Sequence, residues 1–178
     1  MKKVFLTIVL FATSFIAHSQ EKKEAVLTQA EQFSAQAGLL IEKQFLDVGK
    51  VNSVKLQIMS IKDLNSNTVK TALRFEYDYK SSYTSDTKVA TLDKDELDAL
   101  IVSMKNLQTN VYPTTRDNYT EVTFKSRTGF EAGSYFDIGK GWKSFLKLEK
   151  FDKNSMIFFN NEEFITLIPL LEQAKLKM

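Results

Sequence analysis

Residues 69–80 alternate between two kinds of side chain over twelve positions. One set is apolar, aromatic or Thr: Val69, Thr71, Leu73, Phe75, Tyr77 and Tyr79. The other set is charged apart from one Ala: Lys70, Ala72, Arg74, Glu76, Asp78 and Lys80. Successive side chains of an extended chain point to opposite faces, so this pattern predicts a half-buried strand with one side toward water.

The same period recurs along the chain, which predicts a sheet-rich protein. Residues 54–58 and 142–148 repeat it, and shorter runs fit strands at 39–48, 87–92, 119–126, 130–137 and 155–159. Residues typical of turns separate several of these runs, at 63–68, 80–86, 139–141 and 152–154. The Gly139–Gly141 stretch lacks the pattern of a phosphate-binding loop and is interpreted as a hairpin turn.

Two helices are predicted from their capping residues and apolar spacing. Asp93 has Glu96 three residues later, which is the spacing of a capping box, and Leu97 begins a helical apolar repeat. Asn160 and Glu163 repeat the arrangement before a second apolar series. Pro169 falls inside that second helix and is expected to kink it or to loosen one turn.

A constant offset of 67 residues relates the two helices, and each follows an apolar strand. Asp93 then corresponds to Asn160 and Glu96 to Glu163. The offset predicts an internal repeat of four strands and a helix, at about 38–110 and 118–177. We therefore expect an α+β fold, with two successive antiparallel ββββα units packed as one domain.

The first 19 residues have the layout of a cleavable signal peptide. Lys2 and Lys3 precede an uncharged, mostly apolar run, and Ala17 and Ser19 have the small-residue spacing that signal peptidase needs. We expect an exported protein, periplasmic or secreted, with no transmembrane segment once the signal is removed. Residues 20–36 are predicted to be a polar lead-in, and residues 37–178 a single domain.

Signal cleavage would leave a chain without His or Cys, because the chain has no Cys and His18 is its only His. Such a chain has no residues for a Ser–His–Asp triad, a Cys–His pair or the usual zinc sites. Carboxylate-only chemistry, Ser–Lys nucleophiles and calcium sites stay open. The acidic run at 93–98 lacks the Gly and the later Glu of a calcium loop. We predict no enzyme, no metal and no cofactor.

The balance of charge bears on nucleic-acid binding. The 24 Lys and Arg residues fall to 22 without Lys2 and Lys3, against 22 Asp and Glu residues. A nucleic-acid-binding domain is expected to carry a basic excess. The near-neutral mature chain therefore makes a nucleic-acid partner an unfavoured alternative.

Several segments resemble a family of uncharacterised exported proteins common in Bacteroidota. They are residues 82–93, 119–133, 146–152 and 170–175, and the resemblance covers most of the chain after the signal. The family implies export but no established activity. The paired plan of four strands and a helix also resembles the whirly and PC4-like fold, which implies single-stranded nucleic-acid binding by analogy of fold alone.

Five residues are candidates for a binding site: Trp142, Tyr77, Tyr79, Tyr135 and Arg127. Trp142 could be a stacking platform for a sugar or peptide, or a core or edge anchor beside Leu146 and Leu148. Arg127 could hold an anion, or be a surface Arg beside a turn. We expect a non-catalytic module that binds a protein or another envelope component. The alternatives are a carboxylate-based polysaccharide hydrolase, a nucleic-acid-binding protein, and a carrier of small molecules or lipids.

Overall fold

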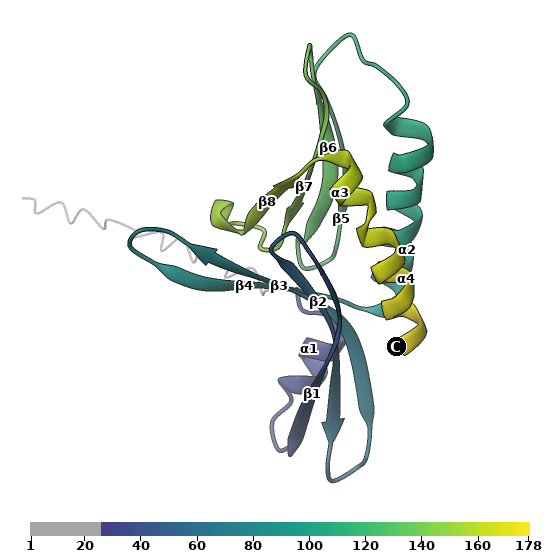
Figure 1. Cartoon of the computed structure of the whole chain (residues 1–178). Coiled ribbons are helices and arrows are strands. Elements are labelled where there is room, and N and C mark those ends of the chain that lie inside the picture. Colours follow the sequence, from purple (N-terminus) through teal and green to yellow (C-terminus); the bar gives the residue numbers. More distant parts are fainter. Residues whose placement is uncertain (1–25) are drawn as a thin grey trace, which may run out of the picture.

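The computed structural model describes residues 26–178, and the predicted signal peptide lies outside these residues. The described chain forms two four-stranded antiparallel sheets, each followed in sequence by helix (Figure 1). The first unit contains α1 (Gln29–Ser34), β1 (Ile41–Val51), β2 (Val54–Asp63), β3 (Val69–Lys80), β4 (Ser85–Leu92) and α2 (Lys94–Asn106), which continues into a π-helical turn at Leu107–Val111. The second contains β5 (Thr120–Lys125), β6 (Glu131–Asp137), β7 (Gly141–Lys147), a 3-10 turn at Lys153–Ser155, β8 (Met156–Phe159), α3 (Asn161–Ile165) and α4 (Leu167–Lys177).

This architecture confirms the predicted α+β class with two ββββα units. Each sheet is a simple meander, in the orders β1-β2-β3-β4 and β5-β6-β7-β8. All eight strands overlap the segments in which the sequence alternates. In Figure 1 α2 and α4 run side by side along the two sheets, and the β3–β4 hairpin projects away from the body.

One hydrophobic core contains side chains from both units. Phe75 of β3 stacks on Phe130, which precedes β6, with ring centroids 4.8 Å apart, and both side chains are fully buried. Leu100 of α2 and Leu171 of α4 belong to the same core. Because the two units bury apolar surface against each other, the junction between them is a fixed part of the fold.

The opposite face of the first sheet is covered by α1, which makes β2 and β3 less exposed than the alternation alone predicts. Ala30 of α1 packs with Met59, Ile61 and Ala72 in a second, smaller core. Ala72 lies on the side of β3 that the sequence pattern assigned to water, yet it is fully buried. Because Ala72 is small, α1 can pack closely against this face of the sheet.

Both predicted helices begin at their predicted caps. Asp93 is the N-cap of α2, and its backbone N–H donates to the carboxylate of Glu96 at 3.1 Å. Asn160 caps α3 by accepting the Glu163 N–H at 2.8 Å. The expected irregularity near Pro169 is a break: α3 ends at Ile165 and α4 begins at Leu167. Pro169 has no N–H to donate to Ile165 four residues earlier.

Candidate functional site

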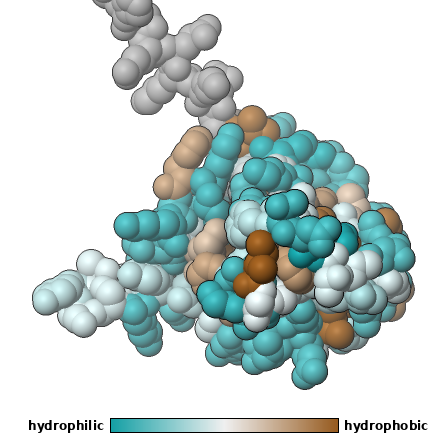
Figure 2. Space-filling view, turned by 90° about the horizontal axis from the view of Figure 1, so that it is seen from above, coloured by the Kyte–Doolittle hydropathy of each residue, from teal (hydrophilic) through white to brown (hydrophobic). Residues whose placement is uncertain are grey.

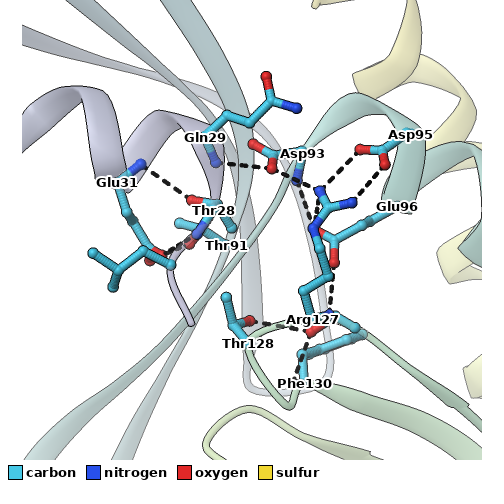
Figure 3. Close-up of polar contacts among 12 residues, drawn as sticks. Thr28, Gln29, Glu31, Thr91, Asp93, Asp95, Glu96, Arg127, Thr128 and Phe130 are labelled. Atoms are coloured by element: carbon cyan, nitrogen blue, oxygen red, sulfur yellow. Dashed lines mark hydrogen bonds and ion pairs between the residues drawn. The ribbon is translucent and has the colours of Figure 1, made fainter. Parts of the chain in front are cut away.

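A network of hydrogen bonds around Arg127 joins the two units at their junction (Figure 3). Arg127 lies in the turn between β5 and β6. Its guanidinium donates to the Asp93 carboxylate at 2.7 Å and to both oxygens of Asp95, at 2.6 and 3.0 Å. Its backbone N–H donates to Glu96 at 2.8 Å. The turn of the second unit is therefore bound to the N-terminus of α2.

Charge pairing in this network shifts the pKa values of Asp95 and Arg127. Hydrogen bonding to Arg127 lowers the pKa of Asp95, and the same contacts raise the pKa of Arg127 above its already high ordinary value. Asp93 and Glu96 are buried, and the N-terminus of α2 adds positive potential beside them. The ion pair of Arg127 and Asp95 is therefore maintained near neutral pH.

The helix α1 is attached to the same network. Gln29 donates its N–H to Asp93 at 2.9 Å. Glu31 accepts the N–H of Thr28 at 2.9 Å and the hydroxyl of Thr91 on β4 (Figure 3). Thr28 is the N-cap of α1 and accepts the Glu31 N–H at 3.1 Å. These bonds hold α1 against β4 and leave a hollow along one side of it.

That hollow is a cavity of about 600 Å³ between the free edge of β4 and the segment that links β7 to β8. Val89, Ala90 and Thr91 form the wall on the β4 side. The facing wall consists of Leu148, Glu149, Lys150, Phe151 and Asp152, and Val26, Glu31, Arg127 and Thr128 complete the lining. Phe151 is 93% exposed at the rim. The ring of Phe151 is therefore accessible beside the cavity.

A buried lysine ties this facing wall to β4. Lys88 contacts Asp86 and lies 2.6 Å from the carboxylate of Asp152 and 3.8 Å from that of Glu149. Hydrogen bonds to Asp152 and then to Asp86 raise the pKa of Lys88, and the Lys88 ammonium lowers the pKa of Asp152. Glu149 also accepts the Val89 N–H, at 3.4 Å. This wall is thus held against β4 by ion pairs and a hydrogen bond as well as by its covalent connection to β7 and β8.

A second cavity of about 390 Å³ adjoins the first on the α1 face of the sheet, and the two share Glu31, Val89 and Thr91. Its floor includes Met59 and Ile61, and Leu27, Ser34, Ala35, Lys43, Phe45 and Arg74 also line it. The Arg74 guanidinium carbon lies 5.4 Å from the centre of the Phe45 ring. We call the two adjoining cavities the α1 cleft.

Comparison of the sequence with models of known protein families and with curated proteins gives no match. The resemblance to an exported Bacteroidota family and to the whirly fold therefore stays a prediction. Within residues 26–178 no helix is long and apolar enough to cross a membrane. Within the same residues no group of three or more Asp and Glu side chains is arranged to hold a metal ion.

The structure brings one of the five candidate residues, Arg127, to the α1 cleft. Trp142 is 8% exposed on β7, where its ring nitrogen donates to the Thr114 carbonyl at 2.7 Å and Arg116 covers its ring at 5.5 Å. This environment fits a buried anchor better than an open stacking platform, because a platform needs a free ring face.

The three candidate tyrosines lie away from the cleft. Tyr77 is half-buried on β3 and packs against the main core, and Tyr79 lies two residues further along the projecting hairpin. Tyr135 of β6 packs beside Tyr119, with ring centroids 6.1 Å apart. The five candidates therefore do not form one site.

Sequence reasoning missed Glu31, Lys88 and Phe151, which shape the cleft. One signal was available, because Thr28 and Glu31 have the spacing of a capping box and so locate the start of α1. Lys88 and Asp152 are 64 positions apart, and no local pattern connects residues at such a separation. Their pairing depends on how the two sheets pack.

Proposed function

We propose that this protein is a non-catalytic, exported binding module, and that the α1 cleft binds an extended segment of a protein partner in the cell envelope. The observation that carries the proposal is the position of the larger cavity against the free edge of β4. An edge strand offers backbone groups to which an extended peptide can add as a further strand, and a peptide that pairs at Val89 would replace the Glu149 carboxylate as the acceptor of its N–H. The adjoining apolar cavity offers space for side chains of that peptide.

The exposed Phe151 supports a macromolecular partner. Aromatic side chains at the edge of a hollow are common anchors in protein interfaces, because they bury a large area at a small cost in conformational entropy. The Lys150 ammonium lies 5.1 Å from the centre of its ring, which leaves the other ring face available to a partner.

The state of the carboxylates favours binding over hydrolysis. A glycosidase needs a general acid whose pKa is raised. In the larger cavity the pKa of Asp152 is lowered by Lys88, and Glu149 interacts with Lys88 and the Val89 N–H. Glu31 accepts two hydrogen bonds. Asp152 is thus stabilised in the charged form, and Glu149 and Glu31 are engaged in contacts within the chain, which suits a structural or binding role.

The proposal is tested by selecting displayed random peptides on residues 20–178 and measuring the affinity of the enriched peptides by calorimetry. Phe151→Ala is expected to weaken binding by about tenfold or more, since an anchoring aromatic is lost. Tyr83→Ala is the matched control, because Tyr83 is 96% exposed but lies at the tip of the β3–β4 hairpin outside the cleft. Equal affinities for the two variants, or no enrichment, would contradict the proposal.

A further inference from the structure

The strand β1 has a free edge in the described part of the chain, where it is hydrogen-bonded to β2 alone. It runs from Ile41 to Val51, and its central residues are exposed. Phe45 is 49% exposed and Leu46 is 53% exposed. A long edge strand with apolar residues in water is a template for pairing with another strand, and natural proteins usually protect such edges.

A bulge and a covering side chain from α4 are present at one end of β1 only. The register with β2 shifts between Asp47 and Gly49, which marks a bulge. Leu170 of α4 lies so close to Gly49 that a Cβ there would be 2.8 Å from a Leu170 methyl carbon. From Ile41 to Asp47 the register with β2 is unbroken. The stretch free to pair is therefore Ile41 to Asp47.

This stretch is complementary to itself in charge. When two antiparallel copies are centred on Phe45, Lys43 of each copy faces Asp47 of the other, and the two Phe45 rings face each other. These three residues share one face of the strand, because they are two positions apart. Opposite charges and aromatic pairs directly across a strand pair are stabilising. Lys43 and Asp47 are both exposed, so they can reach a second copy, where Lys43 would add a second cation to an Asp47 carboxylate that already binds Lys55 at 3.0 Å and Gln57 at 2.7 Å within its own chain.

Other registers lose this complementarity. If the centre moves to lie between Gln44 and Phe45, Glu42 faces Asp47 and Lys43 faces Leu46. Like charges directly opposite are destabilising. A centre on Gln44 places Lys43 opposite Phe45. The charge pattern therefore selects the register centred on Phe45.

We propose that the protein forms a two-fold symmetric dimer by antiparallel pairing of β1 with β1 of a second copy, centred on Phe45. The two first sheets then become one continuous sheet, as in a closed isologous interface. Lys43 and Phe45 also line the smaller cavity of the α1 cleft, so the dimer brings the two clefts together at the symmetry axis. The dimer does not depend on the proposed peptide binding.

Cysteine cross-linking tests the register, because the chain has no Cys of its own. Residues directly opposite in an antiparallel pair have Cα atoms about 4.5–5.5 Å apart, within the range that a disulfide spans. Phe45→Cys is expected to form a covalent dimer on mild oxidation. Gln44→Cys is the matched control, since Gln44 is a neighbouring exposed residue that faces Leu46 in this register. Equal cross-linking of both variants, or of neither, would overturn the proposal.

Charge reversal tests the proposed ion pairs between Lys43 and Asp47 of the second copy. Sedimentation velocity measures dimer formation at chain concentrations up to about 100 µM, because a small interface is expected to bind weakly. Asp47→Lys and Lys43→Asp are each expected to raise the dimer dissociation constant about tenfold, because both symmetry-related pairs become like-charged. The double variant is expected to recover most of the affinity. Circular dichroism confirms that each variant is folded. A wild-type monomer over the whole range, or no recovery, would refute the dimer.

Discussion

The guanidinium of Arg127 lies between Asp93 and Asp95, and its backbone N–H binds Glu96. Asp93 and Glu96 have side chains that are 7% exposed, and the Arg127 guanidinium lies 2.7 Å from the Asp93 carboxylate and 3.3 Å from that of Glu96. Arg127 thus provides hydrogen bonds to the carboxylates at the start of α2 and holds one wall of the α1 cleft in place. Sequence reasoning identified Arg127 as a candidate anion-binding residue, and its anions are carboxylates of the same chain.

Replacement of Arg127 tests this role in stability. We expect Arg127→Met to lower the free energy of unfolding by about 1–3 kcal/mol, because it leaves buried carboxylates without their cation while part of the guanidinium was already in water. Arg127→Lys should lower the free energy of unfolding by less, since Lys keeps the positive charge but not the forked geometry of the guanidinium. Urea unfolding of the three proteins at neutral pH measures the difference. Identical unfolding midpoints would mean that the network contributes little.

Among the elements, strands and helix starts were predicted well because their signals are local. The alternation at 69–80 depends only on which face each side chain takes, and the caps at Asp93 and Asn160 depend on residues three positions apart. The short helix α1 falls in residues 20–36, which were expected only as a polar lead-in, because its stability depends on packing against Ala72 and Ile61. The α1 cleft was not predicted, since it is formed by segments distant in sequence.

The break between α3 and α4 gives a prediction at this scale. Pro169 lies in the first turn of α4, where the missing N–H would have no partner within the helix. Pro169→Ala is therefore expected to change the free energy of unfolding by less than about 1 kcal/mol. Gln173→Pro, at an exposed position in the middle of α4, is expected to cost about 3 kcal/mol or more.

Thermal and urea unfolding followed by circular dichroism compares these two variants with the wild type. A large loss in Pro169→Ala would show that the proline itself stabilises the break. A small loss in Gln173→Pro would show that α4 contributes little to the shared core, against the burial of Leu171 and Ala174.

The whole molecule is two units that share one core and are joined at their surface by the Arg127 and Lys88 networks. Figure 2 shows the molecule from above as a mostly hydrophilic surface with separate hydrophobic patches. The internal repeat explains why two similar halves exist, but the cleft is not repeated, because α1 precedes only the first sheet. The predicted repeat therefore indicated the architecture of the two units but did not indicate where the α1 cleft lies.

Acid is expected to weaken the whole fold. Hydrogen bonds and nearby cations lower the pKa of Asp47, Asp63, Asp95 and Asp152. A lowered folded-state pKa contributes stability that is present above the unfolded-state pKa, about 3.9 for Asp, and is lost as pH falls through the folded value. Urea midpoints should be nearly level from pH 7 to about 5 and should fall steeply below about 4. Unchanged midpoints at pH 3 would contradict these interactions.

The central claim is that a partner segment occupies the α1 cleft, and amide hydrogen exchange with and without a selected peptide tests it most directly. The account predicts slower exchange at Val89–Thr91 and at residues 148–152 when the peptide is bound, with little change in β5 and β6. Protection confined to β5 and β6, or saturating binding with no change at Val89–Thr91, would contradict it.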